Sequence, residues 1–75
     1  MVNATILMRL LKDSAGNRIL ESVKKIQGVK DAYYVFGRYD IVAYARTEDY
    51  PALARLALKL NALKGVRSTE TLIEG

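Results

Sequence analysis

One pattern occurs twice in this sequence, and it limits the folds that are open to a chain of 75 residues. In each half, apolar residues at helical spacing lead into a Gly-Val pair, and a segment typical of a β-strand follows. The pairs Gly28-Val29 and Gly65-Val66 are 37 residues apart, about half the chain. This spacing predicts two similar strand–helix–strand units in a single domain over residues 1–75.

The first half begins with a predicted strand over about residues 2–12, because every even position from Val2 to Leu10 is apolar and the odd positions are mixed. Asp13 or Ser14 is placed to cap the helix that follows. That helix is expected to end in two lysines, with Gly28 as its C′ residue. Its apolar stripe consists of Ala15, Ile19, Val23 and Ile26, with Leu20 beside it.

The middle of the chain predicts a hairpin. Residues 29–36 and residues 41–46 are rich in aromatic and β-branched side chains, which favour strands. Between them lies the short segment Gly37-Arg38-Tyr39-Asp40. Two strands separated by a short segment with glycine are typical of an antiparallel hairpin, so this segment joins the two halves.

The second half predicts another helix and a last strand. Asp49 can cap the helix, and Pro51 suits its first turn, where a missing N–H costs little. Leu63-Lys64-Gly65 is expected to end the helix, before a strand over residues 66–74. The stripe that faces the core consists of Leu53, Leu56, Ala57 and Leu60.

Two such halves give the order βαββαβ. Right-handed connections place both helices on the same face of a four-stranded antiparallel sheet. The expected fold class is therefore α+β, with the ferredoxin-like arrangement of two split βαβ units.

The other face of that sheet is left open. If the even positions of the first strand meet the helices, Leu7 and Leu11 point away from them. Tyr33, Tyr34 and Tyr44 cannot all be hidden under two helices. An exposed apolar and aromatic face is usually an interface. We therefore expect a homodimer that packs through its sheets, in a dimeric α/β barrel-like assembly.

The residue types exclude several kinds of chemistry. The chain has no Cys and no His, which excludes disulfides and the usual ligand sets for zinc, haem and iron–sulfur clusters. A Ser, Thr or Lys nucleophile has no histidine base beside it. The carboxylates form no recognisable acid/base pair, and there is no Gly-rich phosphate loop. We expect no metal site, no cofactor and no enzyme activity.

The charge pattern does not indicate a nucleic-acid surface. The net charge is +4, but Lys24-Lys25 is the longest basic run and the other cations are scattered. No apolar run reaches the roughly 18 residues of a membrane span, and the first residues do not resemble a signal peptide. We expect a cytoplasmic protein.

Two short patterns have both a structural and a functional interpretation. Gly37, Tyr39 and Asp40 suit a tight turn. They could also hold a zwitterion, with backbone amides facing its carboxylate and Asp40 facing its ammonium. Thr69 and Thr71 suit a strand, but they also place two hydroxyls on one sheet face, each able to donate and accept.

Together, these patterns resemble the effector-binding domain of the leucine-responsive regulatory protein/asparagine regulator (Lrp/AsnC) family, also called the RAM domain. The resemblance covers essentially the whole chain. The matching stretches are Gly28-Val29, Val35-Phe36-Gly37-Arg38-Tyr39-Asp40-Ile41-Val42 and Gly65-Val66-Arg67-Ser68-Thr69-Glu70-Thr71.

The resemblance implies dimers that pair through their sheets and assemble into rings, commonly octamers or decamers. It implies that amino acids bind between dimers, near Gly37, Tyr39, Asp40, Thr69 and Thr71. Ser68 matches the motif too, but its side chain should point to the opposite face. The sequence starts at the first strand, so it resembles the stand-alone form of the domain without the helix-turn-helix unit.

These implications predict a non-enzymatic regulatory module that binds a small effector, an amino acid, at a site between subunits and modulates the assembly of transcription regulators. One alternative is a structural oligomerisation partner of full-length Lrp/AsnC regulators that has no ligand of its own. Another is a small enzyme, or an enzyme's regulatory subunit, on the same fold, because fold alone does not fix function.

Overall fold

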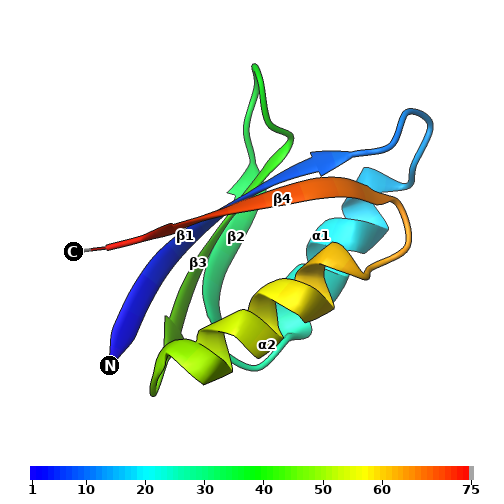
Figure 1. Cartoon of the computed structure of the whole chain (residues 1–75). Helices are drawn as coiled ribbons and strands as arrows, with labels where there is room; N and C mark the ends of the chain where they lie inside the picture. Colours follow the sequence, from blue (N-terminus) through cyan, green and yellow to red (C-terminus); the bar gives the residue numbers. More distant parts are fainter. Residues whose placement is uncertain (75) are drawn as a thin grey trace.

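The computed structural model describes residues 1–74, and its six elements follow the predicted order. The elements are β1 (Val2–Leu10), α1 (Gly16–Lys25), β2 (Val29–Tyr34), β3 (Ile41–Thr47), α2 (Tyr50–Asn61) and β4 (Val66–Ile73). The strands form one antiparallel sheet in the order β2-β3-β1-β4. Both helices cover the same face of this sheet (Figure 1). The predicted ferredoxin-like fold is confirmed.

The core lies between the helices and the even positions of β1. Ile6 and Met8 are fully buried there, because alternate residues of a strand point to the same face. Burying each such side chain stabilises the fold by about 1.5–3 kcal/mol. The buried cluster consists of Ile6, Met8, Ile19, Val23, Ala32, Ile41, Ala43, Ala45, Leu56 and Leu60.

The predicted cap of α1 is wrong. The helix begins at Gly16, and its N-cap residue, Ala15, makes no side-chain hydrogen bond to it. The hydroxyl of Ser14 instead donates to the carbonyl of Leu11 at 2.6 Å. Asp13 has a φ of 69°, so it belongs to the turn between β1 and the helix. Hydrogen bonds within a turn compete with helix capping for Ser and Asp side chains, and here both residues belong to the turn.

The ends of two strands and the role of Gly28 also differ from the prediction. β1 ends at Leu10, two residues early, and β2 ends at Tyr34, also two residues early. Helix α1 ends with Lys24-Lys25, as predicted, but its C-cap is Ile26, so Gly28 is not the C′ residue. Gly28 instead belongs to the turn into β2, where its φ is 102°. In the stripe of α1, Ile19 and Val23 are buried, whereas Ala15 is exposed.

The predicted start of α2 is confirmed, although the helix ends at Asn61, before Leu63-Lys64-Gly65. The Asp49 carboxylate accepts a hydrogen bond from the backbone N–H of Ala52 at 2.9 Å, and Pro51 lies in the first turn. A side-chain cap of this kind typically stabilises a helix by about 1 kcal/mol.

Gly65 marks a place where α1 and the turn before β4 approach closely. Its φ is +96°, and a Cβ built there would lie 2.6 Å from Cδ1 of Ile19. The carbonyl of Gly65 also accepts from the backbone N–H of Leu11 at 2.7 Å. A larger residue would therefore disturb the packing of the first helix and the end of β1 together.

We predict that Gly65→Ala lowers the free energy of unfolding for two reasons. The positive φ is unfavourable for alanine and costs about 1–3 kcal/mol, and overpacking against Ile19 costs about as much again. Gly37→Ala is the matched control, because Gly37 has a φ of +127° but no heavy atom within 4 Å of the added Cβ. Urea denaturation at one protomer concentration measures both. Equal losses for the two variants would contradict the close approach, and Ile19→Val should restore part of the loss at Gly65.

Candidate functional site

The uncovered sheet face is apolar in its middle and aromatic at one side. Strand register places Leu7 of β1 opposite Val42 of β3, and Thr5 opposite Tyr44 and Leu72. Tyr33 and Tyr44 are 42% and 41% exposed on this face, and their hydroxyls are hydrogen-bonded at 2.9 Å. The expectation of an exposed apolar and aromatic face is confirmed for these residues.

Leu11 was expected on that face but lies elsewhere, and of the three tyrosines that could not all be hidden, Tyr34 is on the other face. Tyr34 alternates with Tyr33 along β2 and is paired with the buried Ile41, so it lies on the helix side, where it is 45% exposed. Leu11 follows the end of β1 and is part of the turn that leads to α1. The uncovered face is therefore smaller than the sequence predicted.

The loop between β2 and β3 is fastened to the end of β1. The backbone N–H of Asp40 donates to the carbonyl of Met8 at 2.9 Å, and the backbone N–H of Leu10 donates to Oδ2 of Asp40 at 2.8 Å. The loop is closed by a bond from the Val35 N–H to the Asp40 carbonyl at 3.0 Å. Asp40 therefore holds the hairpin in place, and its carboxylate has acceptor positions left for a further partner.

Tyr39 connects the same loop to β4. Its hydroxyl donates to a carboxylate oxygen of Glu70, which lies opposite Leu7 on the uncovered face. This hydrogen bond raises the pKa of Tyr39 above the ordinary value of 10.0, together with desolvation and the Glu70 charge. Arg38 and Arg9 act on that pKa in the opposite direction. The hairpin thus spans the sheet from β3, over β1, to β4.

Thr69 and Thr71 lie on the other face of β4. They are paired with Met8 and Ile6, whose side chains point to the helices. Thr69 Oγ1 also lies 3.4 Å from Oδ1 of Asn61 in α2, as a hydrogen-bond donor. The two threonines do share a face, as predicted.

A single copy of the chain therefore separates the five predicted site residues into two groups. Gly37, Tyr39 and Asp40 lie in the hairpin loop, whereas Thr69 and Thr71 lie on the helix side of the sheet. Ser68 is paired with Arg9 and points to the opposite face from the threonines, as expected.

Glu70 was missed by the sequence analysis. It occupies the unspecified position between the two threonines, and alternation alone places it on the uncovered face. Its contact with Tyr39 depends on how β4 is aligned with β1, which no local pattern reveals.

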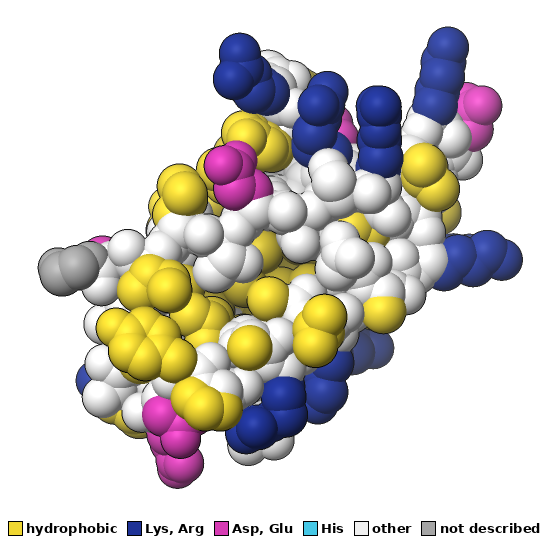
Figure 2. Space-filling view, in the orientation of Figure 1, with side chains coloured by type: hydrophobic (Ala, Val, Ile, Leu, Met, Phe, Trp, Pro, Cys, Tyr) yellow, Lys and Arg dark blue, Asp and Glu magenta, His cyan; other side chains and the backbone are white. Residues whose placement is uncertain are grey.

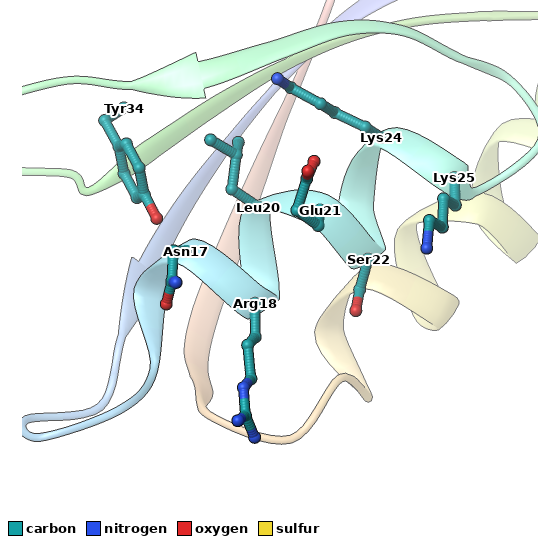
Figure 3. Close-up of a pocket in the computed structure, with 8 residues that line it drawn as sticks. All are labelled: Asn17, Arg18, Leu20, Glu21, Ser22, Lys24, Lys25 and Tyr34. Carbon is teal, nitrogen blue, oxygen red and sulfur yellow. The ribbon is translucent and has the colours of Figure 1, made fainter.

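A hollow of about 530 Å³ lies beside α1 (Figure 3). Residues of α1 line it, with Tyr34 at one end, and no predicted site residue takes part. Tyr34 lies toward Asn17, whereas Arg18 points to the opposite side (Figure 3). Ligand sites have a few polar groups that converge on one point, and these side chains do not converge.

Within residues 1–74, no three His, Cys, Asp or Glu side chains are grouped so that they could hold a metal ion. No helix in the same range is long and apolar enough to cross a membrane.

Comparison with known proteins identifies the family. The protein-family sequence model of the Lrp/AsnC ligand binding domain matches residues 3–74. The chain belongs to this family. A sequence search finds no match among curated proteins.

Solved structures agree with this assignment to the Lrp/AsnC family. TTHA0845 from Thermus thermophilus is 30% identical, with a TM-score of 0.92, over 100% of this chain and 94% of that one. AsnC of E. coli is 27% identical, with a TM-score of 0.89, over 97% of this chain and 50% of AsnC. The transcriptional regulator NMB0573 of Neisseria meningitidis, solved as a complex with L-Met, has the same fold at 20% identity, with a TM-score of 0.86, over 97% of this chain and 49% of that one.

We predict that Tyr39 titrates above its ordinary pKa and that Glu70→Gln moves its pKa back toward 10.0, because the charged hydrogen-bond acceptor is removed. The protonated hydroxyl is the donor, so the contact is present below this pKa and is lost as the pH rises through it. Tyrosine ¹³Cζ shifts in an NMR titration report the pKa directly. Glu74→Gln is the control and should leave Tyr39 unchanged; the same pKa in Glu70→Gln would contradict the contact.

Proposed function

We propose that this chain is a non-enzymatic regulatory module that binds an amino acid at a site between subunits, and that binding changes the assembly of a transcription regulator. Its membership of the Lrp/AsnC ligand-binding domain family supports the ligand-binding role. The similarity to the regulator AsnC supports the regulatory context. The complex of the Neisseria regulator with L-Met suggests the kind of effector to test first.

The fastened hairpin is the observation on which this proposal rests. Asp40 is held by the backbone of β1 but can still accept hydrogen bonds from an ammonium group. Gly37 beside it leaves open space, since a Cβ there would have no neighbour within 4 Å. An amino acid needs an anionic partner for its ammonium, N–H donors for its carboxylate and room for its backbone. Asp40 supplies the anionic group and Gly37 the room, and we propose backbone N–H groups of the same loop as the donors.

The assembly in this proposal begins with a dimer through the uncovered sheet face. Leu7 and Val42 form its apolar middle, Tyr44 lies on its aromatic side, and Leu72 is 51% exposed on the same face. A second copy placed against this face would remove these side chains from water, at roughly 25 cal/mol for each Å² of apolar surface. Further contacts between dimers would build the ring that we propose for the complete assembly.

We predict that at least one of the twenty amino acids raises the melting temperature, because a ligand at a hundredfold excess over its Kd stabilises the folded state by about 2.7 kcal/mol. Asp40→Asn keeps an acceptor for the Leu10 N–H but loses the charge, so affinity should fall about 10- to 100-fold, as for a hydrogen bond to a charged group. Isothermal titration calorimetry measures this loss.

Asp31→Asn is the matched control for that variant. Asp31 also accepts a hydrogen bond from a backbone N–H, that of Ala32 at 2.9 Å, but it lies on β2, outside the hairpin loop. Its Kd should equal that of the unmodified chain. A chain that no amino acid stabilises would contradict the proposal and favour a structural partner of full-length regulators.

We further predict that Leu72→Asp lowers the mass of the assembly at micromolar concentration, because it places a charge in the proposed sheet interface. Leu11→Asp is the control, since Leu11 is equally exposed at 50% but lies in the turn after β1. Light scattering after gel filtration gives both masses. A monomeric unmodified chain, or no change in Leu72→Asp, would contradict the sheet dimer.

A further inference from the structure

The two halves of the chain are related by an approximate twofold rotation. Ile6 and Ala43 are 37 residues apart, which is the spacing of the sequence repeat, and they lie directly opposite each other in the pairing of β1 with β3. Two antiparallel neighbours have a local twofold axis between them, and here it passes between these two residues. The rotation therefore places each residue of the first half near the position 37 residues later. Gly28 and Gly65 are such a pair, with φ angles of 102° and 96°.

This rotation relates two hollows beside the helices. The first has a volume of about 670 Å³ and lies between α1 and the turn after α2. The second has a volume of about 370 Å³ and lies between α2 and the turn after α1. Arg18 lines the first and Arg55 lines the second, and these two arginines are again 37 residues apart. The two hollows are therefore equivalent sites in the two halves of the fold.

Both hollows are cationic. Three basic side chains and one acidic side chain line the first, and the same numbers line the second. The basic residues are scattered along the sequence, and the fold brings them together in these two places. They are Lys12, Arg18 and Lys64 in the first hollow and Arg46, Arg55 and Lys59 in the second.

The basic side chains are open to solvent and accessible to a partner. Arg18, Arg55 and Lys59 are all exposed. Arg18 extends from α1 on the side opposite to that of Lys24 (Figure 3). Arg55 and Lys59 are one turn apart on α2, a rise of about 6 Å. Figure 2 shows Lys and Arg side chains along the edge of α2 that is away from β4. A large anion that lies across both helices can therefore contact both hollows.

The residue types favour the phosphate groups of a double helix over other polyanions. Arginine binds phosphate through two parallel hydrogen bonds. Single-stranded nucleic acids also need aromatic side chains that stack on the bases, and membrane surfaces favour aromatic side chains that insert beside the cations. Within residues 1–74, neither hollow is lined by Tyr or Phe. The two strands of a duplex are related by twofold axes, as the two hollows are.

We propose that the helix face of this chain binds the phosphate backbone of double-stranded nucleic acid, with one strand at each hollow. Arg18 and Arg55 make the central contacts, and the lysines beside them add to the attraction without reading the bases. The net charge of +4 is consistent with a polyanionic partner. This contact goes beyond the proposed function, because it requires no amino acid and uses neither the hairpin nor the uncovered sheet face.

Fluorescence anisotropy with a short labelled DNA duplex tests the contact at several NaCl concentrations. The logarithm of the affinity falls with the logarithm of the salt concentration, with a slope of about −0.9 for each phosphate contact. Arg18→Gln and Arg55→Gln should each make this slope shallower by about 1 and weaken binding about tenfold at roughly 50 mM salt. The two effects should be equal, because the two arginines are equivalent under the twofold rotation.

Two control variants accompany the arginine variants. Lys24→Gln removes the same charge from α1 but on the side opposite to that of Arg18, so its slope should equal that of the unmodified chain. Arg18→Lys keeps the charge and should keep the slope. Both arginines are exposed, so their replacement should leave the fold intact.

Several results would overturn the proposal. One is no binding of the duplex at low salt, and another is a slope in the two Gln variants equal to that of Lys24→Gln. Tighter binding of the single strand, or displacement of the duplex by polyglutamate as readily as by unlabelled DNA, would also contradict it. Binding to phosphatidylserine vesicles in place of the duplex would indicate a membrane surface instead. All samples are free of amino acid, so these results do not depend on whether the chain binds an effector.

Discussion

Strand β1 is hydrogen-bonded to β3 on one side and to β4 on the other, and this double pairing determines where the other functional groups lie. The core depends on the even positions of β1, where Ile6 and Met8 are fully buried under the helices. The position of the β2–β3 hairpin depends on the C-terminal end of β1, where the Leu10 N–H and the Met8 carbonyl bond to Asp40. The face of each β4 side chain also follows from register with β1, since Thr69 is paired with Met8.

The sheet gives one chain two surfaces of different character. The helices bury one face in their own core, and the other face presents Tyr33, Tyr44 and Leu72 to solvent. A domain of this size buries only about 60% of the surface of its unfolded chain, so contact with further copies is a direct way to gain burial. The proposed function links assembly to ligand binding, because the proposed site residues are divided between the hairpin and the helix side of β4.

Local pattern predicted the fold because alternation in β1 and the helical stripes are properties of short segments. The cap of α2 was predicted for the same reason: Asp49 bonds to a residue only three positions away. The predicted cap of α1 was wrong, because the Ser14 hydroxyl donates to the Leu11 carbonyl in the preceding turn instead. The contact of Tyr39 with Glu70 joins residues 31 positions apart and depends on the alignment of three strands. Such alignment is a property of the whole sheet.

The most direct test of the account asks what covers the open sheet face. In a mixture of isotope-labelled and unlabelled chains, a filtered NOE experiment detects only contacts between copies. Pairing through the sheets should give intermolecular NOEs from the rings of Tyr33 and Tyr44 to methyl groups of Leu7 and Leu72. Intermolecular NOEs from other surfaces, with none from these four residues, would contradict the claim that two copies of this domain are joined through their sheets.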